Sequence, residues 1–121
     1  MFTITKEFHF SASHQLRGLP TEHPCSNLHG HNYIVTVELT DIKLNDVGFV
    51  IDYRALNPIK NWIDSEFDHK NLNDVVSFNP TAENIAKYLY QIFKGAFSQL
   101  SAVTVSETEK TKATYKPEYD S

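Results

Sequence analysis

The first fourteen residues alternate apolar and polar side chains, and this period of two constrains the fold more than any other stretch. The even positions are apolar and end in a histidine, in the order Phe2, Ile4, Phe8, Phe10, Ala12 and His14. The odd positions from Thr3 to Ser13 are polar, and Lys6 is the one interruption on the even face. Successive side chains of a β-strand point to opposite faces. The pattern therefore predicts a half-buried strand that ends with an imidazole on its apolar face.

A second strand is predicted from about His29 to Asp41, after a loop over residues 15–28. The β-branched run that follows Tyr33 favours a strand. His29 and His31 then lie two residues apart and point to the same face. If this strand returns antiparallel to the first, its start meets the end of the first strand, and both imidazoles lie beside His14.

Three imidazoles gathered in this way predict an open metal site. Histidine nitrogens bind zinc at about 2.0–2.1 Å, and a site with three protein ligands leaves a position for water or substrate, as catalytic zinc sites do. A cupin-like alternative would use Glu38 as a further ligand, but its parity is opposite to that of His29 and His31, so it faces away on a regular strand. His9 and His23 are isolated, and we interpret them as ordinary polar residues.

Further candidates for chemistry lie outside the histidine cluster. Cys25 stands in a polar loop next to the predicted cation, which favours a thiolate, although a free cysteine is often a small buried residue. The pair Asp68-His69 either caps the end of a helix or provides a carboxylate-oriented imidazole that passes protons. Glu107 is the acid on the apolar face of the last strand, so it needs a basic partner or a ligand with two N–H donors. Arg17 is a candidate for binding phosphate, although a surface arginine is usually only solvated.

The remaining patterns predict two helices and two more strands. They are a strand over 49–51, a helix with Asn57 as cap and Pro58 as first residue, a helix from a Thr81 cap to Gly95, and a strand over 102–107. We therefore expect an α+β fold, a four-stranded antiparallel sheet with both helices on one face. We also expect the other face to keep apolar side chains and to be covered in an oligomer.

Composition excludes several classes of protein. The 121 residues predict a single domain over 1–121, and a net charge of −4 without a basic run argues against nucleic-acid binding. A single cysteine makes no intrachain disulfide and suits a reducing cytosol. The chain has no apolar run of membrane length and no signal peptide pattern, so we expect a cytoplasmic protein.

Six motifs, spread over nearly the whole chain, resemble those of the 6-pyruvoyl-tetrahydropterin synthase family. They are Phe10-Ser-Ala-Ser-His14, Cys25-Ser-Asn-Leu-His29-Gly-His31-Asn32, Val50-Ile-Asp-Tyr53, Asp68-His69 with Leu72-Asn73, Asn79-Pro-Thr-Ala-Glu83-Asn84 and Val105-Ser-Glu107-Thr108. The four-residue step from Cys25 to His29 and the short chain are most similar to the bacterial branch, which forms 6-carboxytetrahydropterin in queuosine (deazapurine) biosynthesis.

The resemblance implies a tunnelling fold, in which the sheets of several subunits close into a β-barrel, usually in a homohexamer of two trimers. It also implies a role for each candidate residue. His14, His29 and His31 would bind zinc, Cys25 would be the proton acceptor, and Asp68 with His69 would relay protons. Glu107 would bind the 2-amino and ring N–H edge of a pterin. Glu107 is sometimes counted with the relay.

The activity implied by the resemblance is that of a zinc-dependent carbon–carbon lyase. Its substrate would be 7,8-dihydroneopterin triphosphate, and its products 6-carboxytetrahydropterin, acetaldehyde and triphosphate. The same residues fit a sister enzyme that stops at 6-pyruvoyl-tetrahydropterin or cleaves dihydroneopterin to a hydroxymethylpterin, and a zinc or pterin-binding module without turnover. Two features depart from the family, namely Pro58 in the first helix and the charged run Glu109–Lys112 after Glu107.

Overall fold

The computed structural model describes residues 1–118 and contains a five-stranded sheet with the order β3-β1-β2-β4-β5. Its strands are β1 (Phe2–His14), β2 (His29–Asp41), β3 (Lys70–Asn71), β4 (Leu100–Thr108) and β5 (Thr111–Tyr115). Its helices are α1 (Asn57–Glu66), α2 (Leu72–Val75) and α3 (Ala82–Lys94), with 3-10 turns η1 (Pro24–Ser26) and η2 (Tyr53–Leu56). None of the helices within residues 1–118 has the length and apolar character needed to cross a bilayer.

Strands β1 and β2 form a long antiparallel pair that runs from Phe2 opposite Asp41 to His14 opposite His29. In this register Ala12 lies opposite His31. The predicted bounds of both strands and their antiparallel return are confirmed. The pairing matters for function because it places the last residue of β1 and the first residues of β2 at the same end of the sheet.

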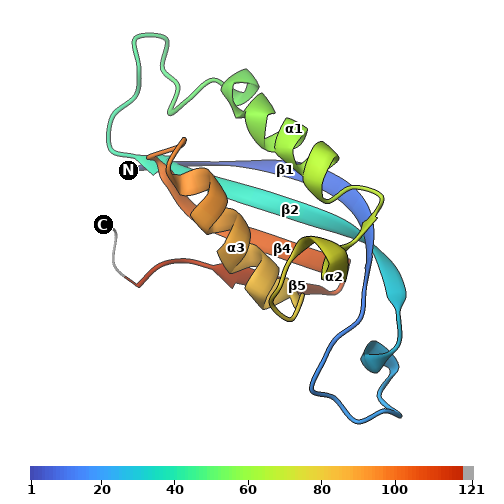
Figure 1. Cartoon of the computed structure of the whole chain (residues 1–121). Coiled ribbons are helices and arrows are strands. Elements are labelled where there is room, and N and C mark those ends of the chain that lie inside the picture. The colour runs from blue at the N-terminus through green and yellow to red at the C-terminus, as the bar shows by residue number, and fades with distance from the viewer. Residues whose placement is uncertain (119–121) are drawn as a thin grey trace.

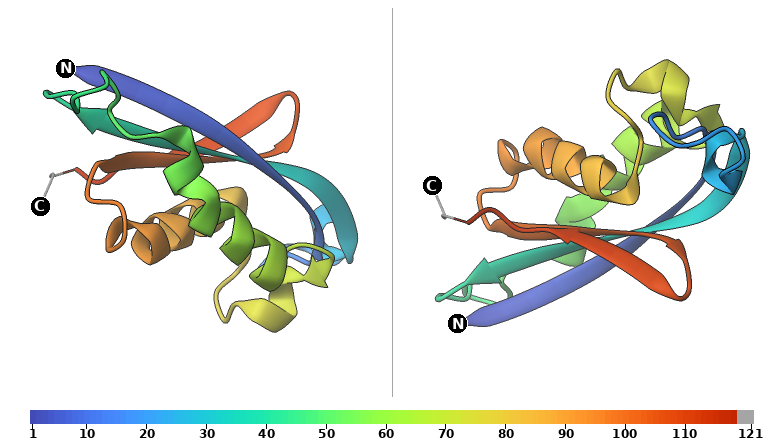
Figure 2. Two further views of the ribbon diagram at one scale, coloured as in Figure 1. Left: turned by 90° about the horizontal axis from the view of Figure 1, so that it is seen from above. Right: turned by 90° about the horizontal axis from the view of Figure 1, so that it is seen from below.

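One face of the sheet is covered by α1, α2 and α3, which lie in front of the strands in Figure 1 and to one side of the sheet in Figure 2. The core lies in this layer, and its fully buried members include Val35, Val37, Leu39, Ile59, Ile63, Phe67, Ile85 and Leu89. Burial of each such side chain stabilises the fold by roughly 1.5–3 kcal/mol before other terms. The packed layer gives the strand ends a rigid support.

The opposite face of the sheet is polar, which corrects the expectation of an apolar face there. The side chains of β1 and β2 that alternate with the buried ones are Thr3, Thr5, Glu7, His9, Ser11, Asn32, Ile34, Thr36, Glu38 and Thr40. Ile34 is the single large apolar side chain in this set. The expectation of an apolar face covered in an oligomer is therefore wrong for this face of the sheet.

The two predicted helices are present as α1 and α3, with one shift at the start of α1, and the four-residue α2 was not predicted. Thr81 caps α3 by accepting a hydrogen bond from the Asn84 N–H at 3.1 Å, and Gly95 is its C-cap, as predicted. In α1, Asn57 is the first residue rather than the cap, because η2 precedes the helix and Leu56 occupies the cap position. Pro58 remains in the first turn, where its missing N–H costs no helical hydrogen bond.

The strand count differs from the prediction. Residues 49–51 form an irregular loop instead of a strand. The sheet gains β5 and the two-residue β3, which pairs parallel with β1 at Ala12 and Ser13. The last predicted strand is confirmed as β4, slightly longer than expected.

Candidate metal centre and active site

The side chains of His14, His29 and His31 converge at the end of the β1–β2 pair. One nitrogen from each ring lies within 4.8 Å of the others, and these three form the possible metal-binding group among the described His, Cys, Asp and Glu residues. His14 is fully buried, and the other two are half-buried. The predicted convergence is therefore confirmed, and one side of the cluster stays accessible for a ligand.

Backbone carbonyls fix the orientation of two of these rings. His14 Nδ1 lies 2.8 Å from the Pro80 carbonyl oxygen, and His29 Nδ1 lies 2.7 Å from the Asn27 carbonyl oxygen. A carbonyl only accepts, so each Nδ1 carries the proton and each neutral ring has a lone pair on Nε2. The two Nε2 atoms are 3.0 Å apart. Two lone pairs that face each other at this distance repel unless a cation or a proton lies between them, so the donor set fits a metal ion.

The third ring supports the same conclusion. His31 Nε2 is buried without a hydrogen-bond partner in the described part of the chain, and the nearest charge to it is Glu107 Oε2 at 3.6 Å. Burial lowers the pKa of His31 below its ordinary value of 6.5, and the charge of Glu107 opposes that shift. Burial also lowers the pKa of His14. Neutral imidazoles are the form that binds a metal ion.

Glu107 lies on β4 close to the irregular pairing between β4 and β5, with its side chain about one-quarter exposed. Val103 and Val105, which precede it on the same face, are buried, as predicted. The Tyr33 hydroxyl is also buried without a partner among residues 1–118, and burial followed by the charge of Glu107 raises its pKa, so it stays protonated. The carboxylate therefore stands at the edge of the cluster, where a ligand can reach it.

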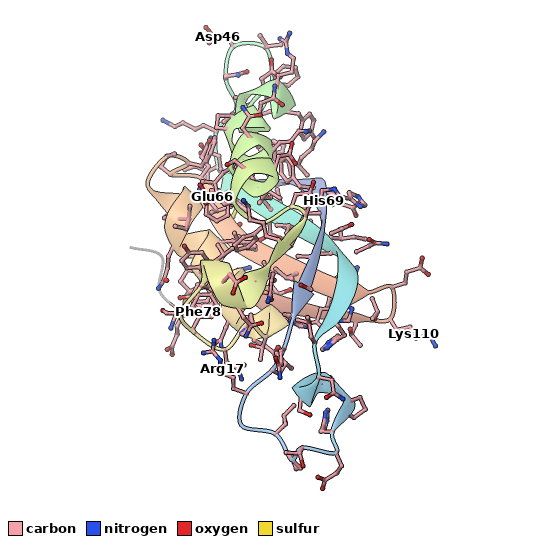
Figure 3. All side chains as sticks on the ribbon, turned by 45° about the vertical axis from the view of Figure 1, so that its right-hand side comes forward. Arg17, Asp46, Glu66, His69, Phe78 and Lys110 are labelled. Carbon is pink, nitrogen blue, oxygen red and sulfur yellow. The ribbon has the colours of Figure 1, made fainter. Side chains whose placement is uncertain are left out.

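Asp68 and His69 form a turn after α1 that is bound to β1. Ser11 donates its N–H to Asp68 Oδ1 at 2.9 Å and accepts a hydrogen bond from the His69 N–H at 2.7 Å. His69 has a positive φ of 59°, and its side chain is 85% exposed and projects outwards beside β1 (Figure 3). Its Nε2 lies 3.5 Å from Asp68 Oδ2. Within the described residues the His69 ring binds no carbonyl of α1, so its side chain does not cap that helix.

Cys25 and Arg17 lie in the loop that joins β1 to β2. Cys25 is half-buried in η1, its N–H donates to His23 Nδ1 at 3.1 Å, and its carbonyl accepts from the Leu16 N–H at 2.9 Å. His23 thus has a capping role that its sequence position did not reveal. Arg17 is exposed and donates from Nη1 to the Ser77 carbonyl at 3.2 Å, close to Phe78 in Figure 3.

Several contributors to the site were missed in the sequence. The carbonyls of Asn27 and Pro80 orient the imidazoles, but a backbone atom leaves no signature in residue type. Asn32, which accepts from Ser11 Oγ at 2.7 Å, appeared only as part of a motif. The buried Tyr33 hydroxyl was not singled out either.

The chain matches the family model described as 6-pyruvoyl tetrahydropterin synthase over residues 3–118. It is 30% identical to a 6-carboxy-5,6,7,8-tetrahydropterin synthase of Bacillus subtilis, over 96% of this chain and 86% of that protein. It is 32% identical to a 6-pyruvoyl tetrahydrobiopterin synthase of Dictyostelium discoideum, over 95% of this chain and 96% of that protein. The solved structure of Caenorhabditis elegans 6-pyruvoyl tetrahydropterin synthase superposes with a TM-score of 0.83 at 32% identity, covering 97% of this chain and 96% of that one. This likeness confirms the expected α+β tunnelling fold.

Proposed function

We propose, from the premise that this chain belongs to the 6-pyruvoyl tetrahydropterin synthase family, that it is a zinc-dependent lyase of pterin metabolism. Its substrates are 7,8-dihydroneopterin triphosphate and water, and its products are 6-carboxytetrahydropterin, acetaldehyde and triphosphate, in the queuosine (deazapurine) pathway of the cytosol. The observation that carries the proposal is the pair of Nε2 lone pairs of His14 and His29 that face each other, with Glu107 Oε2 3.6 Å from Nε2 of the third ring, His31.

In this proposal His14, His29 and His31 hold the zinc ion. Zinc, when bound, is a Lewis acid that polarises oxygen atoms and lowers the pKa of neighbouring groups. Neutral rings whose other nitrogen is hydrogen-bonded to a carbonyl are suited to this task, because the bond fixes both the tautomer and the direction of the lone pair.

The other proposed residues bind the pterin and move protons. The Glu107 carboxylate accepts hydrogen bonds from two parallel N–H groups of the pterin ring, and this pairing offsets the cost of partly burying the acid. Cys25 Sγ, as a thiolate, takes a proton from a substrate carbon, and His69 with Asp68 passes protons onward. Arg17 remains a proposed phosphate contact on the loop.

We further propose that the chain works as a single domain in a homo-oligomer, as a hexamer of two trimers. The support is an unsatisfied sheet edge. Within the described residues β3 covers β1 only at Ala12 and Ser13, so the longer part of this edge keeps free backbone donors and acceptors.

The test is incubation of the purified protein with dihydroneopterin triphosphate, followed by mass spectrometry of the pterins and an assay for acetaldehyde. A carboxypterin and acetaldehyde in equal amounts support the proposal. A 6-pyruvoyl product supports the second candidate, which the names of the Dictyostelium and Caenorhabditis relatives favour. If the metal-loaded protein forms no product, the remaining candidate is a zinc or pterin-binding module without turnover.

A further inference from the structure

The 3-10 turn η1, which carries Cys25 in the loop beyond the ends of β1 and β2, begins at a histidine cap (Figure 1). His23 Nδ1 accepts a hydrogen bond from the Cys25 N–H at 3.1 Å. The His23 carbonyl accepts from the Ser26 N–H at 3.0 Å and from Ser26 Oγ at 2.7 Å. The backbone of His23 is extended, with a φ of −70° and a ψ of 131°, as is usual for a capping residue. His23 therefore binds the turn through both its side chain and its backbone.

The bond to Cys25 requires one tautomer of the His23 ring. A backbone N–H only donates, so Nδ1 carries no proton and the neutral ring has its proton on Nε2. The ring is exposed and forms no ion pair within residues 1–118, so capping is the contact that its position offers. The side-chain oxygen of asparagine is a preferred cap acceptor as well. His23→Asn can therefore keep the cap without the imidazole, whereas His23→Ala removes both.

The turn η1 is also bound to the segments that carry two of the proposed zinc ligands. The Cys25 carbonyl accepts from the N–H of Leu16, two residues after His14, at 2.9 Å. Asn27 is the C-cap of η1, and its carbonyl oxygen lies 2.7 Å from His29 Nδ1. These bonds hold the turn beside the histidine cluster. The His23 bond then fixes the remaining backbone group of Cys25, its N–H.

The other side chains of this loop bind elsewhere. Gln15 Nε2 donates to the Ser26 carbonyl at 2.7 Å, at the far end of the turn from the cap. Glu22 is exposed, and its Oε2 accepts from Thr21 Oγ1 at 3.4 Å. Within residues 1–118, His23 provides the side-chain acceptor for the Cys25 N–H. Glu22, its neighbour in the chain, is therefore a matched control that leaves the cap intact.

We propose that His23 is a positioning residue for the proton acceptor, because its cap fixes the turn from which Cys25 Sγ reaches the substrate. This inference rests on the proposed function, in which Cys25 takes a proton. A general base contributes only when it is held within hydrogen-bond reach of the proton that it removes. Loss of the cap loosens the turn before Cys25, while the bonds of Leu16 and Asn27 keep the other side of the turn beside the cluster. Proton transfer should therefore slow without loss of the metal ion.

The experiment compares wild type, His23→Ala, His23→Asn and Glu22→Ala as full-length, zinc-loaded proteins. Amide hydrogen exchange, measured by mass spectrometry on the peptide over 22–28, reports on the turn without any need for turnover. His23→Ala should exchange the amides of residues 25–27 about tenfold faster, because their protection depends on the closed turn. His23→Asn should stay within about threefold of wild type, since it keeps the acceptor. Glu22→Ala should exchange like wild type.

Steady-state kinetics with dihydroneopterin triphosphate give the second measure. His23→Ala should lower kcat about tenfold, as for a misplaced catalytic group, and leave KM within about threefold of wild type. His23→Asn should restore kcat to within about threefold of wild type, and Glu22→Ala should not change it. Circular dichroism and elemental analysis of each variant show that fold and zinc are retained.

Three results would overturn the proposal. They are unchanged exchange in His23→Ala, unchanged kcat in that variant, or failure of His23→Asn to restore either quantity. The two proposals fail separately. A wild-type protein that forms no product contradicts the lyase, and unchanged exchange in His23→Ala contradicts the positioning role whether or not product forms.

Discussion

His69 donates its backbone N–H to the carbonyl of Ser11 at 2.7 Å while it holds a left-handed φ of 59°. The Ser11 N–H in turn donates to Asp68 Oδ1. Strand β1, which ends in a proposed zinc ligand, therefore also positions the proposed relay. A residue with a side chain costs of order 1 kcal/mol in this backbone region, and such strain is typical of functional sites.

Replacement of His69 by glycine should separate stability from activity. Glycine adopts a positive φ without strain, but it also makes the unfolded chain more flexible, so we expect His69→Gly to change the free energy of unfolding by less than about 1 kcal/mol. Product formation should fall about 100-fold or more, because the imidazole is lost. Urea unfolding and the product assay measure the two effects. A stable variant with full activity would contradict the relay role.

Removal of one imidazole should remove the metal ion. We expect His31→Ala, purified without chelator, to lose most of the zinc that the wild-type protein carries, since two ligands hold zinc much more weakly than three. His9→Ala is the matched control, because His9 is exposed on β1 and lies outside the cluster. Elemental analysis gives the metal content per chain. Equal zinc in both variants would show that the ion binds elsewhere.

Acid should destabilise the metal-free protein through the buried histidines. Burial lowers the pKa of His14 and of His31 below the ordinary value of 6.5, so below that pH the unfolded chain binds more protons than the folded one. The contribution of these groups to stability is fully present above about pH 6.5 and is lost as the pH falls. Urea unfolding of chelator-treated protein should show this loss. The double variant His14→Gln/His31→Gln should be less sensitive to acid, and an unchanged pH profile would count against this account.

The thiol of Cys25 should matter for turnover and little for metal binding. We expect Cys25→Ala to keep its zinc, because the sulfur is not part of the three-histidine group. Its rate of product formation should fall by a factor of about 100 or more, as for the loss of a general base. Steady-state kinetics and elemental analysis on the same preparation check both points. Full activity in the zinc-loaded variant would mean that another group takes the proton.

The sequence predicted those parts of the molecule that depend on alternation and spacing. The period-two patterns of the first two strands determined their faces, and the step from His29 to His31 placed both imidazoles on the side of His14. The Thr81 cap and Gly95 defined α3 for the same reason, because local hydrogen bonds and backbone freedom decide where a helix begins and ends.

The parts that the sequence did not predict depend on tertiary contacts. Residues 49–51 are apolar and β-branched enough for a strand, but the Asn45 side chain accepts from three backbone N–H groups at residues 47–49, and Gln99 Nε2 donates to the Val50 carbonyl. Strand β3 exists because the turn at His69 brings Lys70 beside Ala12. The Pro80 carbonyl reaches His14 across 66 positions of the chain.

The positions of His14 and His29 have one more consequence. These residues stand at the two ends of the loop over 15–28, so an ion bound to both acts as a cross-link that closes this loop. The ion stabilises the folded chain by its binding free energy, because the unfolded chain does not hold the three rings together. Chelation should therefore free the amides of this loop to exchange with solvent while the helix-covered core keeps its protection. Because Cys25 lies inside the loop, loss of the ion would disorder the proposed proton acceptor before the domain itself unfolds.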